Sequence, residues 1–270
     1  MAGSAGGTIA SNKGESDWAS AADRWIFVFM AALFFVTALA GFVPDSVKKI
    51  DMVAASARPA FPLILHVHAV LMGAWLSLLL VQSALMASGN RRLHMTLGAS
   101  ALILAPAIVI TGAVLVPTIY AQYWEAAALA TGAERAGLEA ELLRKGNVAL
   151  RNIQSGVLFS VLVTLAFRAR LTDPDFHKRM MFLATVVPLP AAIARMTWLP
   201  TTMPASPLSL DLFMLALVAP MFVWDMVRQR HVHRAYVVWV AWWLPVTGLV
   251  HLLWGSDWWL SRVPILMGVG

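Results

Sequence analysis

Side chains able to bind a cofactor recur at a fixed spacing in one apolar segment, residues 61–87. His68, Trp75 and Gln82 follow one another every seven residues. Because seven residues make nearly two turns of an α-helix, all three lie along one stripe. A stripe with His and Gln in an apolar helix is expected to face other helices rather than lipid. His66 lies roughly 200° around the helix from His68, so these two imidazoles are not expected to share a ligand.

Four further polar side chains recur at one depth in other apolar segments, namely Arg151, Arg195, Asp211 and His251. At about 1.5 Å per residue, each lies roughly 5–10 Å from the same membrane boundary, as does His68. The pattern favours a pocket in the outer half of a helical bundle. His68 and His251 could be metal ligands to a haem b iron, with Arg151 and Arg195 pairing with its propionates.

The same side chains would suit a quinone headgroup. His and Arg would hydrogen-bond its carbonyl oxygens, Trp75 would pack on its ring and Gln82 would support the stripe. A structural interpretation competes with both cofactors. Arg195 and Asp211 could form an ion pair, and polar groups near a boundary can reach the headgroup region. The residues alone leave these alternatives open.

A second set of histidines lies in two short basic loops on the other side. His94 precedes one apolar segment and His177 precedes another. The two could approach each other and bind an anionic headgroup or a metal ion. Alternatively, these loops only fix the topology, since neighbouring Arg charges disfavour metal binding at His. His231 and His233 fit the topological interpretation.

Composition indicates that membrane helices position these side chains. Of 270 residues, 60% are apolar and 13% are charged, against about 25% charged in soluble domains. The net charge of +6 comes from short loops, so topology explains it better than nucleic-acid binding. Cysteine is absent, which excludes thiolate iron–sulfur and zinc sites, covalent c-type haem and disulfides.

Hydropathy predicts an all-α polytopic bundle of seven membrane helices. A crossing needs about 20 apolar residues, and seven segments qualify: 25–43, 61–87, 97–118, 148–167, 180–199, 208–226 and 235–254. Pro188 and Pro190 are expected to kink the fifth. Eleven Lys and Arg flank one side and seven the other, which predicts an N-terminus inside and a C-terminus outside.

The remaining segments are assigned by composition. Residues 1–24 are polar and rich in Ser, Gly and Ala, and predict a flexible tail. The apolar run from Trp25 is long for a signal core, so we expect a retained helix. Residues 125–145 lack Pro and are rich in helix formers, which predicts a helix within the long loop 119–147. Residues 255–270 form an expected interfacial tail, in which Trp258 and Trp259 join Trp254 as anchors.

The segment 61–196 resembles a group of uncharacterised bacterial multi-spanning membrane proteins. The resemblance is carried by the His68–Trp75–Gln82 stripe, by Leu93-His94-Met95-Thr96-Leu97-Gly98, and by His177-Lys178-Arg179-Met180-Met181 followed by Arg195. An Arg usually follows the loop His in that group, where this chain has Met95. The resemblance implies a helical membrane fold and singles out these residues, without implying a reaction.

No hydrolase, metalloprotease or nucleotide-binding motif occurs in the chain. The leading expectation is therefore a redox-associated protein of the bacterial inner membrane that binds haem b or quinone. One alternative is a non-catalytic accessory subunit of a larger membrane complex, in contact with lipid and other subunits. The other is a small-molecule transporter or sensor, which paired broken helices would support. Nucleic acid is not expected as a partner.

Overall fold

A computed structural model describes the chain from residue 7 to residue 270, with side chains described from residue 21. Within these residues the protein is all-α and has no strand. The helices are α1 (Gly7–Ala54), α2 (Leu63–Ala87), α3 (Arg91–Gly98), α4 (Ala101–Leu129), α5 (Gly132–Ala169), α6 (Pro174–Val186), α7 (Pro190–Ile193), α8 (Leu208–Gln229), α9 (Arg234–Leu253), α10 (Asp257–Leu260) and α11 (Val263–Leu266).

In this part of the chain, six helical segments are long and apolar enough to cross a membrane. They are Ala21–Ala54, Leu63–Ala87, Arg91–Leu129, Gly132–Ala169, Leu208–Gln229 and Arg234–Leu253. Their outward faces carry large exposed apolar side chains, such as Ile103 and Leu252. Such surfaces in water would promote aggregation, and in lipid they are the expected exterior. The chain is thus a multi-pass helical bundle suited to a bilayer.

The fifth predicted segment, residues 180–199, is not a continuous helix. α6 ends at Val186, the single turn α7 follows Leu189, and no regular helix continues from Ala194 to Pro207. Pro188 and Pro190 lack the backbone N–H that a continuing helix would need. α6 is nonetheless the most enclosed helix, since Met180, Leu183 and Ala184 are completely buried.

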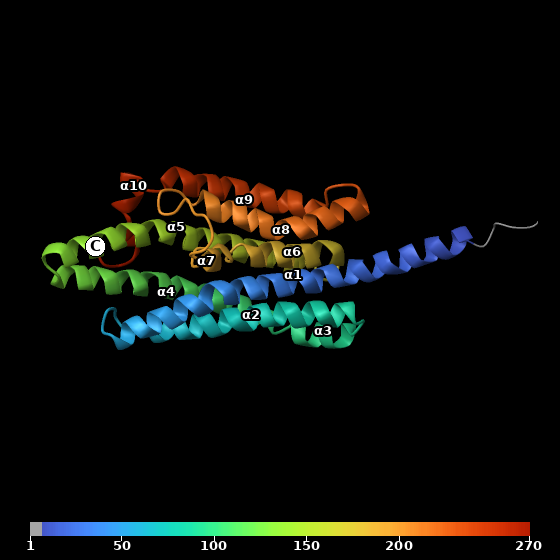
Figure 1. Cartoon of the computed structure of the whole chain (residues 1–270), viewed down its shortest axis with the longest axis horizontal. Coiled ribbons are helices and arrows are strands. Elements are labelled where there is room, and N and C mark those ends of the chain that lie inside the picture. The colour runs from blue at the N-terminus through green and yellow to red at the C-terminus, as the bar shows by residue number, and fades with distance from the viewer. Residues whose placement is uncertain (1–6) are drawn as a thin grey trace, which may run out of the picture.

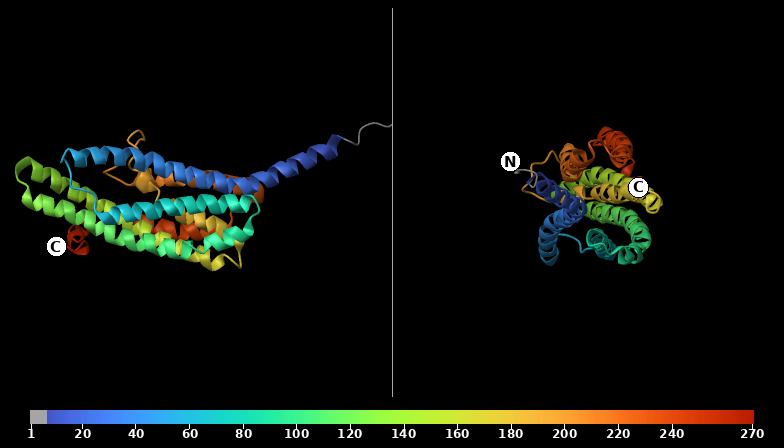
Figure 2. Two further views of the ribbon diagram at one scale, coloured as in Figure 1. Left: turned by 90° about the horizontal axis from the view of Figure 1, so that it is seen from below. Right: turned by 90° about the vertical axis from the view of Figure 1, so that its right-hand side faces the viewer.

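Two flanks surround this central helix (Figure 1). α2, α3 and the start of α4 lie on one flank, α8 and α9 lie on the other, and α5 and α6 lie between them. The end-on view in Figure 2 shows the same division. α5 and α6 run antiparallel, so the chain enters α6 at the end of the bundle where α5 finishes and leaves α7 toward the opposite end.

Both terminal segments differ from the sequence expectation. α1 begins at Gly7, so residues 7–24 are helical rather than a flexible tail, whereas residues 1–6 lie outside the described residues. At the other end, Trp259 is 5% exposed and its indole N–H donates to the Gly146 carbonyl at 2.9 Å. The C-terminal segment therefore packs against α5, and of its two tryptophans only Trp258 is exposed.

The long loop predicted at 119–147 is almost entirely helical. α4 continues to Leu129 and α5 begins at Gly132, so only two residues separate the two helices. The expectation of a helix in 125–145 is confirmed apart from this break, at which Gly132 adopts a positive φ of 59°. α5 therefore runs for 38 residues, about 57 Å, and its first turns extend beyond the predicted crossing at 148–167.

Candidate functional site

Arg151, Asp211 and His251 meet near the end of the bundle where α8 begins and α9 finishes. An Arg151 guanidinium N–H donates to one Asp211 carboxylate oxygen at 2.6 Å, and His251 Nε2 lies 2.8 Å from the other. Since a carboxylate only accepts, the His251 Nε2 carries the hydrogen. Arg151 is 8% and Asp211 3% exposed. This cluster joins α5, α8 and α9, and Nε2 of His251 is engaged by protein rather than free to ligate iron.

One helical turn further in, a second hydrogen bond continues the α5–α9 contact. The Gln154 side-chain amide donates to the Thr247 hydroxyl at 2.6 Å, and both side chains are buried. Gln154 lies three residues after Arg151 and Thr247 four residues before His251, so both pairs occupy one seam. Arg151 and Gln154 therefore share one inward face of α5.

Arg195 takes part in a different contact from the one expected. Its Nε donates to Asp45 on α1 at 3.1 Å, its guanidinium lies 4.5 Å from the centre of the Phe42 ring, and it also donates to the Ala191 carbonyl. The possible Arg195–Asp211 ion pair is absent, because Arg151 occupies Asp211. Arg195 instead ties the segment after α7 to the far end of α1.

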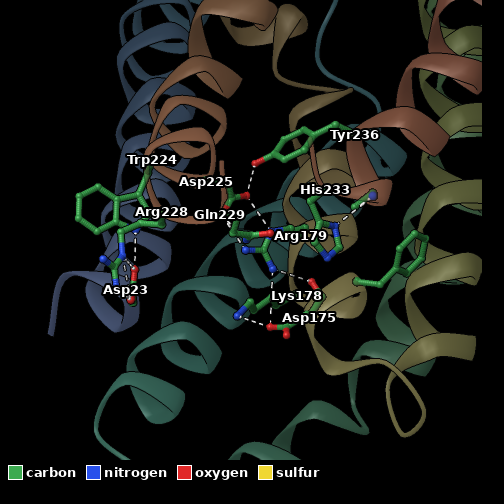
Figure 3. A network of polar contacts seen from close by, with 12 residues as sticks. Asp23, Asp175, Lys178, Arg179, Trp224, Asp225, Arg228, Gln229, His233 and Tyr236 are labelled. Carbon is green, nitrogen blue, oxygen red and sulfur yellow. Dashed lines mark hydrogen bonds and ion pairs between the residues drawn. The ribbon is translucent and has the colours of Figure 1, made fainter. Parts of the chain in front are cut away.

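At the opposite end of the bundle, Arg179, Asp225 and Tyr236 form a second buried cluster (Figure 3). Arg179 donates from Nε and from a terminal nitrogen to the two Asp225 oxygens, at 2.7 and 2.6 Å. The Tyr236 hydroxyl donates to Asp225 at 2.6 Å, and Gln229 adds a bond of 3.2 Å. Arg179 and Asp225 are each 4% exposed. This bidentate pair joins α6, α8 and α9.

The sequence analysis did not identify this second cluster. Arg179 was assigned to a basic loop and Asp225 was not singled out. A usable signal exists, because an ionised carboxylate near the end of an apolar helix needs a cation or donors. Asp225 lies 14 residues after Asp211, about four turns on nearly the same face of α8. That spacing could have indicated a second polar contact between α8 and its neighbouring helices.

The predicted stripe on α2 does face the interior, but its members contact different partners. His68 Nδ1 lies 3.0 Å from the Thr111 hydroxyl on α4. Thr111 donates its own hydrogen to the Ala107 carbonyl at 2.8 Å, so it accepts from Nδ1–H of His68. The Trp75 indole donates to Thr185 of α6 at 3.1 Å, and its ring packs edge-on against Phe159, with centroids 5.1 Å apart.

The structure does not bring the six predicted site residues to one place. His68 lies between α2 and α4 on one flank, whereas His251 lies against α8 on the other, with α5 and α6 between them (Figures 1 and 2). Within the described residues, no group of three or more His, Cys, Asp or Glu could hold a metal ion. These two histidines do not fit the axial ligation of one haem. Of the six, only Arg151 and His251 share a cluster.

Gln82, the last member of the stripe, has an unusual environment. Its side-chain nitrogen and oxygen are both buried and have no hydrogen-bond partner. Gly98, at the end of α3, lies so close that a β-carbon there would be 3.3 Å from the Gln82 nitrogen. A buried amide without partners loses its hydration without compensation and calls for a bound molecule such as water or a ligand.

His94 lies beside Gln82, and His177 lies at the same level along the bundle. Trp75 of α2 meets Thr185 of α6. Figure 1 shows α2 and α6 running in opposite directions. Gln82 lies seven residues after Trp75, about 11 Å along the bundle axis from that contact, and His177 lies eight residues before Thr185, about 12 Å in the same direction. His94 is at the same level, with Nδ1 3.4 Å from the Gln82 carbonyl.

Both imidazoles are held through the same ring nitrogen, Nδ1. His177 Nδ1 lies 2.8 Å from the Ala166 carbonyl of α5. Because a carbonyl only accepts, Nδ1 of each ring carries the hydrogen and Nε2 of the neutral ring is a free acceptor. Burial lowers the pKa of His177, the bond to Ala166 opposes this, and positive charge on His94 lowers it further. His94 and His177 therefore lie at the same end of the bundle, each bonded to a backbone carbonyl.

Comparison with known proteins gave no match. No family model, no curated protein and no solved structure matches this chain.

Proposed function

We propose that this protein crosses the bacterial cytoplasmic membrane seven times, with the N-terminus inside and the C-terminus outside. Six long helices supply six crossings. The seventh is the broken segment 180–199, because α6 enters beside the end of α5 and Arg195, after α7, donates to Asp45 near the far end of α1. The excess of Lys and Arg at the N-terminal end favours the cytoplasm for that end.

We further propose that the inner end of the bundle binds a quinone headgroup through Gln82, His94 and His177. The observation that carries this proposal is the buried Gln82 amide, which lacks both a donor and an acceptor partner. A quinol hydroxyl can donate and accept, and a quinone carbonyl accepts, so such a ring can satisfy the amide. A haem offers only acceptors, at its ionised propionates, whereas a quinol hydroxyl also donates, which favours quinone over haem at this position.

The imidazoles supply the proton chemistry that a quinone site needs. Hydrogen bonds from Nδ1 to backbone carbonyls fix the ring orientations and leave Nε2 as the acceptor. The lowered pKa of His177 keeps this ring neutral and able to accept a proton from a quinol hydroxyl. A bound quinone supplies the electron chemistry, while these side chains orient the ring and hold the proton.

The proposal is tested by purifying the protein in mild detergent and measuring bound quinone by extraction, then titrating a short-chain quinone. Gln82→Leu and the double variant His94→Gln/His177→Gln are expected to lower quinone content by on the order of tenfold, since each leaves a polar group unpaired. His66→Gln is the matched control, because His66 lies on α2 but is exposed.

Wild-type protein that neither retains nor binds quinone would reject this function, as would variants that bind quinone as well as wild type. A Soret band in the absorption spectrum would instead indicate haem.

A second candidate function is an accessory subunit of a larger membrane complex. Every outer polar residue of the predicted pocket is engaged within the protein, as Arg151 and Arg195 illustrate. Trp198 and Trp258 expose broad apolar faces and would contact lipid or a partner. Stoichiometric co-purification with other subunits and no quinone would favour this candidate.

A further inference from the structure

A lateral groove of about 710 Å³ lies between α4 and α5, and Gln82 is not among its lining residues. Its α4 wall is formed by residues 101–110 and its α5 wall by residues 159–172. The floor contains buried Ala105 and Val163, whereas Leu102, Ile110 and Thr164 are exposed along its rim. The groove is therefore open to the surroundings of the bundle along its length.

The walls of this groove offer almost no hydrogen bonding. Thr164 donates its hydroxyl hydrogen to the Ser160 carbonyl at 2.7 Å, and Ser160 donates to the Gly156 carbonyl at 2.6 Å. Both hydroxyls therefore have their hydrogen-bond partners within α5. The other lining side chains at residues 101–110 and 159–167 are apolar. The part of a ligand that lies here must be hydrocarbon.

At the inner end, the groove finishes at two arginines. Arg168 and Arg170 line its mouth, are exposed, and meet no carboxylate within the described part of the chain. By contrast, Arg179, Arg228 and Arg234 at the same end each pair with an aspartate. Two unneutralised guanidinium groups at the end of an apolar groove complement an anion, and phosphate is a group that guanidinium binds well.

The length of the groove matches one leaflet. From Phe159 to Arg168 is nine residues along α5, about 14 Å, and half the hydrocarbon core is about 15 Å. An acyl chain that begins at the inner headgroup level would therefore end near the middle of the membrane.

We propose that this groove binds an anionic phospholipid of the inner leaflet, with one acyl chain against α4 and α5 and the phosphate at Arg168 and Arg170. The groove adjoins the proposed quinone site, since Phe167 lines it and packs against the His177 ring with ring centres 6.4 Å apart. The lipid proposal itself uses neither Gln82 nor His94.

The test compares retention of phosphatidylglycerol and phosphatidylcholine with identical acyl chains, measured by native mass spectrometry after release from nanodiscs of equal composition. Wild type is expected to retain phosphatidylglycerol in preference by on the order of tenfold, given two basic residues at the surface. Arg168→Gln/Arg170→Gln is expected to bring the two lipids to parity.

Two further variants separate charge from shape. Arg91→Gln/Arg92→Gln removes the same charge from exposed positions of α3 outside the groove, and should keep the preference. Thr164→Trp fills the groove from its exposed rim and should lower retention of both lipids.

Equal retention by wild type, an unchanged preference in Arg168→Gln/Arg170→Gln, or loss of preference in the α3 control would overturn the proposal. If the wild type retained quinone rather than phospholipid, and Thr164→Trp displaced that quinone, the groove would be assigned to the quinone tail instead.

Discussion

Asp211 and Asp225 lie 14 residues apart on α8, and each carboxylate is held by one arginine and one ring-bearing side chain of α9. Arg151 and His251 hold the first, and Arg179 and Tyr236 hold the second. The two sites are about 21 Å apart along the helix. α8 and α9 are thus fastened to α5 near one end of the bundle and to α6 near the other, by polar contacts within an apolar assembly.

Removing one partner of the Arg179–Asp225 ion pair is expected to destabilise the protein strongly. Asp225→Leu leaves Arg179 buried without its partner, which costs about 3–5 kcal/mol. Arg179→Met/Asp225→Leu removes both charges and should recover most of that loss. The midpoint of unfolding in detergent measures both variants. A double variant no more stable than Asp225→Leu would contradict the charge-pair explanation.

The two arginines predicted to share a pocket should differ in importance. Arg151→Leu strands the buried Asp211 carboxylate and is expected to cost about 3–5 kcal/mol. Arg195→Leu removes a side chain that is 33% exposed, from a carboxylate that Lys49 also neutralises at 2.5 Å, so a loss of about 1 kcal/mol is expected. Thermal unfolding of the two variants side by side checks this order, and equal losses would refute it.

Gly41 permits a contact that no other residue allows. A β-carbon at position 41 would overlap the carbonyl oxygen of Ala192 in α7. Gly41→Ala therefore forces α1 and α7 apart, at a cost of about 1–3 kcal/mol. Gly73→Ala is the matched control, because a β-carbon there meets nothing within 4 Å, and it should stabilise α2 by about 0.5–1 kcal/mol. If Gly41→Ala were as stable as Gly73→Ala, α7 would have to lie elsewhere.

Stability should fall in mild acid because of His177. Burial lowers the pKa of His177 in the folded protein, so below the ordinary His pKa of about 6.5 the unfolded chain binds the proton more readily. Protonation of His177 therefore does not affect the free energy of unfolding well above the ordinary His pKa. It lowers that free energy as the pH falls below the ordinary pKa, toward the lowered one.

His177→Gln cannot be protonated and is expected to show a smaller drop in unfolding midpoint between pH 7.5 and pH 5. His231→Gln, an exposed histidine, should keep the wild-type drop. Identical pH profiles for His177→Gln and wild type would exclude this origin.

The membrane class, the positions of six long helices and the inward direction of the α2 stripe follow from residue type and spacing. Apolar length and the 3.6-residue period are properties of one segment, so they do not depend on which helices pack against it. The same locality explains why the break at residues 180–199 is larger than the kink expected there. Hydropathy measures apolar content, which α6 and α7 have, but not helical continuity, which Pro188 and Pro190 interrupt. The helix predicted at 125–145 likewise reflected local propensity.

The sequence by itself determined which helices carry polar side chains and at what depth. Only the tertiary structure decided their partners, because depth fixes one coordinate and leaves open the direction around the bundle. His68 and His251 face different helices on opposite flanks, whereas His94 and Gln82, drawn from two separate segments, lie in contact at one end. Helix order across the bundle is set by packing among residues far apart in sequence, and spacing along a single helix carries no information about it.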